Sequence, residues 1–128
     1  MSFGQTIRKY FGKRAETRDH HLDPTLKTNY YRTTKDQALK TLKEHFENLP
    51  EYEFNSISED HGEISLLKTR GRKAFIVITV IMVRPFRTAI DFSVSTETIL
   101  PFDFGYSTRL IQKLYEQVNQ KLELVKEN

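Results

Sequence analysis

Cysteine is absent from this chain of 128 residues. Its absence excludes disulfide bridges, thiolate zinc sites and a catalytic thiol, and it agrees with a reducing compartment. A chain of this length can bury a hydrophobic core without such support. We therefore expect one ordinary domain that carries no thiol chemistry.

Long hydrophobic runs are also missing. The longest apolar stretch, AFIVITVIMV at residues 74–83, has ten residues, whereas a membrane-spanning helix needs roughly 20. This stretch predicts a strand. The N-terminus has basic residues but no continuous apolar segment and no small-residue cleavage pattern after them, so we expect no secretory signal and a cytoplasmic location.

The recurrent catalytic motifs are absent as well: the chain has no G-x-S-x-G elbow, Walker loop, G-x-G-x-x-G or H-E-x-x-H. An Asp-Phe-Gly tripeptide at residues 103–105 matches the magnesium-binding loop of protein kinases, but the motifs that act with it are missing. We interpret it as a strand-to-helix turn, in which Pro101 ends the strand and Asp103 or Ser107 caps the helix. No enzymatic activity and no cofactor are expected.

One short run offers metal ligands. It is HHLD, which contains His20, His21 and Asp23. A closed metal site needs about four ligands, and no second cluster with ligand spacing accompanies this one. We expect no metal site.

Charge of one sign is concentrated only at the N-terminus. Residues 1–18 hold five basic residues and one acidic residue, a net charge of +4, whereas the remaining 15 basic and 16 acidic residues sum to −1. The body of the chain therefore lacks a basic surface wide enough to coat nucleic acid, and we expect no specific nucleic-acid partner.

Four apolar residues near the N-terminus recur at the spacing of one helical face: Phe3, Ile7, Tyr10 and Phe11. Basic residues surround them, which predicts a short amphipathic helix and makes the four side chains candidates for contact with an anionic membrane surface. From residue 15 to 32 the periodicity is lost, as in a loop or extended arm. We therefore divide the chain into a basic N-terminal helix and arm, residues 1–31, and a single α+β domain, residues 32–128.

The body shows a helix, four strands and a helix in that order. Helical periodicity covers residues 34–48, after a capping Thr33 or Thr34, and again residues 107–124. The four strand-like segments between them, separated by turn residues, are 52–58, 63–70, 73–83 and 88–97. Short connections make consecutive strands antiparallel neighbours. The predicted fold is α+β with two layers, a four-stranded antiparallel meander with two long helices on one face, in the order α-β-β-β-β-α, preceded by the short amphipathic N-terminal helix.

The strand at residues 73–83 is apolar on both faces. Such a strand is typical of the inside of a sheet that is covered on both sides. The two helices suffice for one face only. The second face is then covered either by the N-terminal arm or by a partner, which could be a second copy of the chain in a dimer.

Basic residues are expected to gather at one end of the meander. The turn between the second and third strands lies at the same end of the sheet as the start of the last helix. Four candidates for anion binding would meet there: Arg70, Arg72, Lys73 and Arg109. The free N–H groups of a helix start favour an anion. A solvated hairpin with an ion pair to Asp103 gives the same pattern, so both alternatives stay open.

Four segments of the chain carry a resemblance to known proteins: LKTNYYRTTKDQALKTL, GEISLLK, VITVIMVRPFRTAIDFSVSTE and LPFDFGYSTRLIQKLYEQVNQKL. Together they resemble a family of small uncharacterised cytosolic proteins of Bacillus and related Firmicutes, over about residues 26–122. The strand that ends in Ser-Thr, followed by Asp-Phe-Gly and a helix, is also distantly similar to a broader bacterial family of unknown function. The resemblance implies a bacterial cytosolic protein and supplies no mechanism.

Three hypotheses about function follow. The first is a non-enzymatic binding or protein-interaction module whose second sheet face engages a protein partner or another copy of itself. The alternatives are a peripheral membrane-surface protein anchored by the basic N-terminal helix, and a small-anion-binding domain that uses the four basic candidates.

Overall fold

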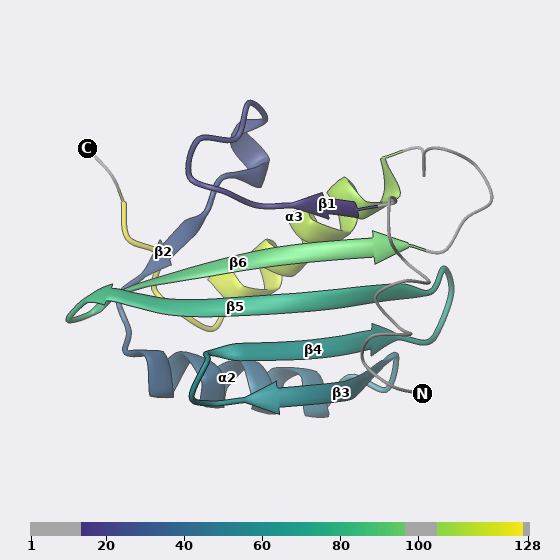
Figure 1. Cartoon of the computed structure of the whole chain (residues 1–128), viewed down its shortest axis with the longest axis horizontal. Helices are drawn as coiled ribbons and strands as arrows, with labels where there is room; N and C mark the ends of the chain where they lie inside the picture. The colour runs from purple at the N-terminus through teal and green to yellow at the C-terminus, as the bar shows by residue number, and fades with distance from the viewer. Residues whose placement is uncertain (1–13, 97–104, 127–128) are drawn as a thin grey trace.

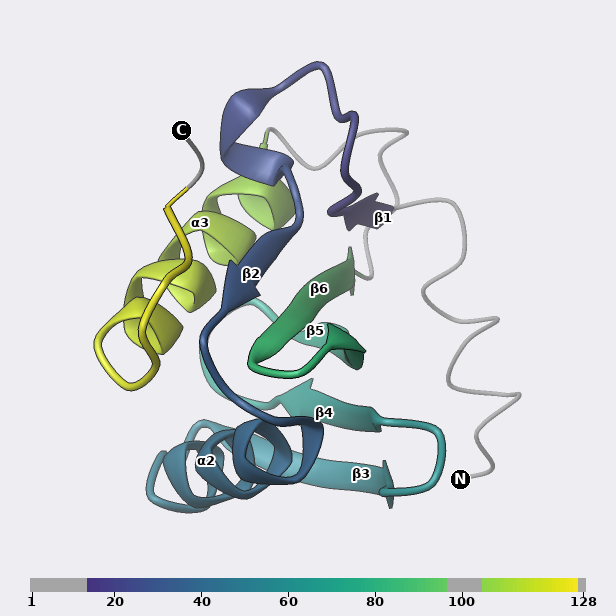
Figure 2. The same ribbon diagram turned by 90° about the vertical axis from the view of Figure 1, so that its left-hand side faces the viewer.

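The structure, a computed structural model, describes residues 14–96 and 105–126. Within these residues one antiparallel sheet of six strands carries two α-helices on one face (Figures 1 and 2). The elements in chain order are β1 (Arg14–Glu16), a 3₁₀ turn η1 (Pro24–Leu26), β2 (Asn29–Tyr31), α2 (Lys35–Glu47), β3 (Tyr52–Ser58), β4 (Glu63–Lys68), β5 (Ala74–Arg84), β6 (Arg87–Thr96) and α3 (Tyr106–Asn119).

The predicted four-stranded meander with two long helices is wrong. The sheet runs β3, β4, β5, β6, and the far side of β6 is paired by two further strands, β1 at one end and β2 at the other. Both come from the segment that the sequence indicated to be an irregular arm. Each has only three residues, too few for an alternation of apolar and polar residues to be recognised, and each forms because β6 offers it a free edge.

The last helix is also shorter than predicted. Helix α3 ends at Asn119, not near residue 124, because the N–H groups of Lys121 and Leu122 turn back to the carbonyl of Val118. The chain then reverses and runs beside β2, where the N–H of Val125 donates to the carbonyl of Tyr30 at 2.8 Å. Leu124 and Val125 therefore lie along the sheet edge beside β2 and do not extend the helix.

Helix α2 begins and ends where its sequence dictates. The hydroxyl of Thr34 accepts a hydrogen bond from the N–H of Gln37 at 3.2 Å, which satisfies one free donor of the first turn. The helix ends at Glu47, shortly before Pro50. Its buried face consists of Ala38, Leu39, Leu42 and Phe46. This face and the buried face of α3 cover the same side of the sheet and enclose the core (Figure 2).

The covered face of the sheet is built from alternating residues of the central strands. Ile76, Ile78 and Val80 of β5 are fully buried against the helices, opposite Val94, Phe92 and Ile90 of β6. On the other face of β5 the side chains become more exposed along the strand, from buried Phe75 through half-buried Val77 and Thr79 to exposed Ile81. The burial of β5 is therefore uneven along its length.

A single carboxylate ties the N-terminal segment to the sheet. The chain leaves the sheet after β1 and returns at β2, and the half-buried Asp91 of β6 lies between the two strands. Its side chain accepts hydrogen bonds at 2.6 Å from the hydroxyls of both Thr17 and Thr28. Backbone bonds from Arg18 to Leu26 and from Thr28 to Arg18 close the loop between them. We call residues 18–27 the clasped loop.

Candidate functional site

The candidates proposed from sequence for membrane contact, Phe3, Ile7, Tyr10 and Phe11, lie outside the described residues. The same holds for Pro101 and Asp103 of the strand-to-helix turn. Gly105 of the Asp-Phe-Gly tripeptide occupies the N-cap position of α3, in a left-handed conformation with φ of 78° and without a side-chain cap.

The basic candidates are only partly brought together. The turn between β4 and β5 lies beside the start of α3, because the hydroxyl of Tyr106 donates to the carbonyl of Arg72 at 3.0 Å and the guanidinium of Arg72 lies 5.0 Å from the Tyr106 ring centre. The exposed Arg109 is on the first turns of the same helix. Arg70 and Lys73 are exposed on the hairpin. Arg72 thus has an aromatic partner, and anion binding at this end stays a prediction.

The residues of the HHLD run form hydrogen bonds that stabilise a turn. The Nδ1 atom of His21 accepts from the backbone N–H of Asp23 at 3.0 Å, and the carboxylate of Asp23 accepts from the hydroxyl and the N–H of Thr25. The two hydrogen bonds from Thr25 lower the pKa of Asp23, because they stabilise the ionised carboxylate. Over the described ranges, no group of three His, Asp or Glu side chains is arranged to hold a metal ion.

The feature that sequence reasoning missed is the far end of the hairpin between β5 and β6. The pairing of β5 with the β3–β4 hairpin ends at Val80, whose N–H donates to the carbonyl of Gly62 at 2.7 Å. The pairing of β5 with β6 continues to Arg84 and Arg87. Residues 81–87, which we call the finger, therefore extend beyond the neighbouring strand, by roughly 13 Å between Val80 and Arg84 at strand spacing (Figure 1).

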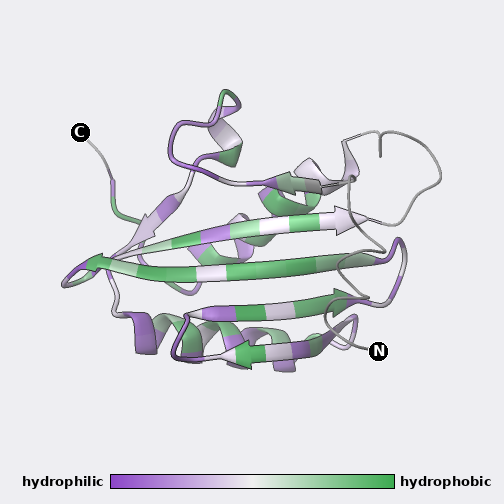
Figure 3. Ribbon diagram, viewed as in Figure 1, coloured by the Kyte–Doolittle hydropathy of each residue, from purple (hydrophilic) through white to green (hydrophobic). Residues whose placement is uncertain are grey.

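The finger exposes large apolar side chains. The exposed fractions are 51% for Ile81, 44% for Met82, 52% for Val83 and 62% for Phe86. Hydrophobic character continues along β5 from the covered part of the sheet into the finger (Figure 3). Singly exposed apolar residues are normal in proteins, but four on one protruding element form a patch, and such patches mark interaction surfaces.

The tip of the finger has an unusual backbone. Arg84 pairs with Arg87 across a two-residue turn of Pro85 and Phe86, and Phe86 has a positive φ of 58°. Positive φ at this position of a turn is normally supplied by glycine or asparagine. A bulky side chain there is strained by about 1–2 kcal/mol. The chain keeps an aromatic residue at the one place in the turn where local energetics disfavour it.

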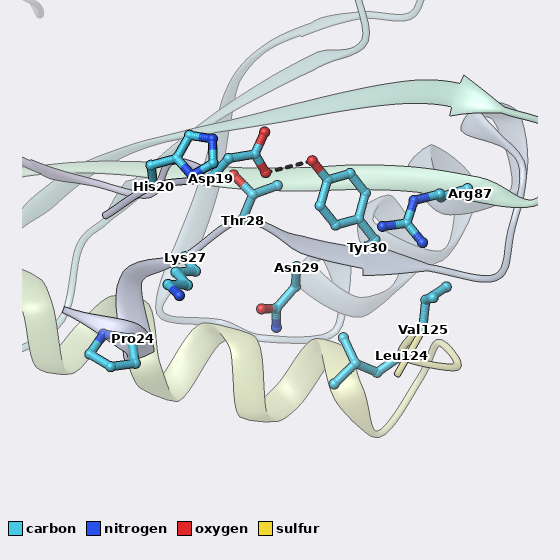
Figure 4. Close-up of a pocket in the computed structure, with 10 residues that line it drawn as sticks. All are labelled: Asp19, His20, Pro24, Lys27, Thr28, Asn29, Tyr30, Arg87, Leu124 and Val125. Carbon is cyan, nitrogen blue, oxygen red and sulfur yellow. Dashed lines mark hydrogen bonds between the residues drawn. The ribbon is translucent and has the colours of Figure 1, made fainter. Parts of the chain in front are cut away.

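A cleft of about 550 Å³ lies at the base of the finger (Figure 4). The guanidinium of Arg87 lies 4.4 Å from the ring centre of Tyr30, and the hydroxyl of Tyr30 donates to Asp19 in the clasped loop. This hydrogen bond, together with partial burial and the negative charge of Asp19, raises the pKa of Tyr30 to about 12. The finger is thereby joined through Arg87 and Tyr30 to the N-terminal segment.

Comparisons with family models, with curated proteins and with solved structures find no match to this chain. The family resemblance therefore stays an expectation from the sequence. Within the described part of the chain, neither helix has the length and apolar character that crossing a membrane requires.

A signal for the finger was present in the sequence. The predicted strand at residues 73–83 has eleven residues, whereas its predicted neighbour at 63–70 has eight. Two strands that start from a tight turn and differ in length leave the end of the longer one without a partner on that side. The overhang falls on the apolar residues before Arg84.

Proposed function

We propose that this protein is a non-enzymatic binding module that engages its partner through the finger. One observation carries the proposal: an element that protrudes from the sheet exposes four large apolar side chains, one of which is a phenylalanine held in a left-handed conformation. Backbone strain in folded proteins is concentrated at sites where function requires it. The finger combines such strain with exposure, which internal packing does not require.

The finger defines what the partner must offer. Arg84 and Arg87 flank its tip, and no acidic residue occurs between Val80 and Ile90. A complementary surface is therefore apolar where Phe86 and Val83 contact it and anionic around them. The backbone that carries these side chains is held by the pairs Met82–Thr88 and Arg84–Arg87 on either side of an irregularity at Val83, which limits the conformational entropy lost on binding.

Site-specific photocrosslinking tests the proposal. A photoreactive phenylalanine analogue replaces Phe86 in one form of the full chain and Leu22 in a matched control. Leu22 is 94% exposed and lies in the clasped loop, outside the finger. We expect crosslinked adducts at position 86 in cells that produce the protein, and we expect unmodified protein in excess to compete them away.

The charge on the finger supplies a second arm of this experiment. Arg84→Glu in the photoreactive protein should lower the adduct yield, because a carboxylate replaces a guanidinium on the surface that meets an anionic partner. Equal yields at positions 86 and 22, or adducts that excess unmodified protein does not reduce, would show that the finger is not the contact element.

A further inference from the structure

We propose that the partner of the finger is an anionic lipid surface, into which the finger inserts its apolar tip. This inference rests on the proposed function, because it identifies the partner of the same element. We favour lipid over a protein or a second copy of the chain because of the shape of the finger, its charge and the strained backbone at its tip.

The finger is apolar on both of its faces. Ile81 pairs with Ala89 and lies on the face opposite the helices, whereas Met82 pairs with Thr88 and lies on the helix side. Both side chains are about half exposed. A protein surface normally covers one face of a hairpin, whereas the lipid interface surrounds an inserted element on all sides. Apolar residues on two faces are therefore suited to lipid.

The position of the finger on the molecule also suits a lipid partner. It lies at one extremity, as Figure 1 shows at the left, and it points toward the viewer in Figure 2. A narrow convex tip can bury little area against a flat protein surface, and stable protein interfaces need about 800 Å² from each partner. Insertion into a fluid interface requires no preformed groove.

The residues around the tip carry the chemistry that an anionic lipid surface requires. Arg84 is exposed and stands next to Pro85 and Phe86 in the turn. Arginine side chains reach outward from apolar surroundings and bind phosphate groups with two parallel hydrogen bonds. Basic residues close to an anionic bilayer each strengthen attachment by about 1 kcal/mol, which corresponds to about a fivefold change in binding. Two copies of a basic finger would instead repel each other.

The strained tip supports the same partner. Phe86 is 62% exposed, so contacts within the protein do not account for the retention of an aromatic side chain at a φ of 58°. Glycine would relieve the strain and leave the turn intact. An aromatic ring at the apex becomes favourable once it is buried at the interface between headgroups and acyl chains.

Vesicle sedimentation of the full chain tests the inference. The vesicles contain either phosphatidylcholine alone or phosphatidylcholine mixed with phosphatidylglycerol. We expect binding to the mixed vesicles, weaker binding as salt is raised, and little binding to the neutral ones. Phe86→Gly should lower the partition coefficient about tenfold, because it removes the inserted ring while it favours the turn. Arg84→Ala should lower it about fivefold.

Two controls separate the finger from other parts of the chain. Leu22→Ser removes an apolar side chain that lies outside the finger and is more exposed than Phe86, 94% against 62%, and it should leave binding unchanged. A double variant, Ile7→Ser with Phe11→Ser, changes the N-terminal stripe instead. Loss of binding in that variant together with full binding by Phe86→Gly would overturn the inference and assign attachment to the N-terminus. The thermal melting of each variant verifies that it is folded.

The outcomes also separate this inference from the proposed function. Absence of binding to mixed vesicles, combined with a competed protein adduct at position 86, would overturn the lipid partner and leave the finger as a contact element for a protein. An adduct between two copies of the chain would overturn it in favour of self-association. Failure of both the vesicle and the crosslinking experiments would remove both proposals.

Discussion

The two ends of β5 differ in burial although they are built from the same kinds of residue. Near Ile76 and Ile78 the strand is fully buried against the helices, whereas from Ile81 to Val83 about half of each side chain is exposed. Hydrophobicity does not distinguish the two ends. The difference is that the first end has strands on both sides and helices over one face, and the second has β6 alone. Burial is therefore decided by neighbours rather than by residue type.

The two ends also differ in how they obey local backbone preferences. Gly62, at the last contact between the β3–β4 turn and β5, has a φ of 66°, and a Cβ there would lie 2.3 Å from the carbonyl oxygen of Val80. The chain places glycine where glycine is required. At Phe86 it places an aromatic residue where glycine is favoured. The covered end follows local backbone preferences, whereas the tip of the finger departs from them.

The largest expected change in stability comes from replacing an isoleucine at the covered end of β5, and an isoleucine at the exposed end provides the comparison. Ile78→Ala should lower the free energy of unfolding by about 3 kcal/mol, because it leaves a cavity in the core. Ile81→Ala should lower it by less than about 1 kcal/mol, since its side chain is already half exposed. Urea denaturation of both variants measures the difference. Similar losses would mean that the finger is packed in solution, which would contradict the comparison.

The next largest change in stability is expected from substitutions at the two left-handed positions, Gly62 and Phe86. Gly62→Ala should lower the free energy of unfolding by about 2 kcal/mol or more, from backbone strain and from the collision with Val80. Phe86→Gly should raise it by about 1 kcal/mol, because the strain at the tip is released. Gly71→Ala serves as a control, since its φ is 67° but its nearest new neighbour is the flexible end of Lys68. Destabilisation by Phe86→Gly would show that the phenylalanine ring packs within the protein.

The smallest effect concerns the boundary between the two ends, where Tyr31 pairs with Thr88. Burial raises the pKa of Tyr31 from its ordinary value of about 10 to about 12. The folded state therefore holds this proton more tightly than the unfolded state, so the contribution to stability is complete below pH 10 and is lost as the pH rises towards 12.

Tyr31→Phe should remove that part of the alkaline decline, about 1 kcal/mol at pH 11. The variant also loses the hydrogen bond from the Tyr31 hydroxyl to Asn119, which shifts its stability equally at neutral and alkaline pH. The measurement is the difference in unfolding free energy between the two proteins from pH 8 to pH 11. A constant difference over this range would show that the folded and unfolded states bind the Tyr31 proton equally tightly.

The sequence was sufficient for elements that local residues determine. The helix predicted at residues 34–48 occupies Lys35–Glu47, because a capping threonine and a stripe of apolar side chains are both local signals. The strands β1 and β2 could not be predicted in this way. Three residues carry no period, and their pairing depends on the free edge of β6, which is far away in sequence.

The candidate site was missed for a related reason. The residues of the finger were recognised as part of an apolar strand, and RPFR was recognised as a turn. Their exposure follows from the length of β4, which ends its pairing at Thr79, and from the end of β2 at Tyr31. The residues from Ile81 to Phe86 do not themselves indicate where the neighbouring strands β4 and β2 end. The strand at residues 73–83 was expected to be covered on both faces, whereas its residues from Ile81 to Val83 are exposed.

The carboxylate of Asp91 has a consequence for how the protein could be altered. Because it binds the hydroxyls of both Thr17 and Thr28, the register of β1 and β2 is fixed at the base of the clasped loop rather than within it. The loop carries Leu22 almost wholly exposed to solvent. Lengthening a closed loop adds only about 0.6 kcal/mol for each doubling of its length. The positions beside Leu22 are therefore suitable for inserting additional sequence, such as an epitope tag or a reporter domain.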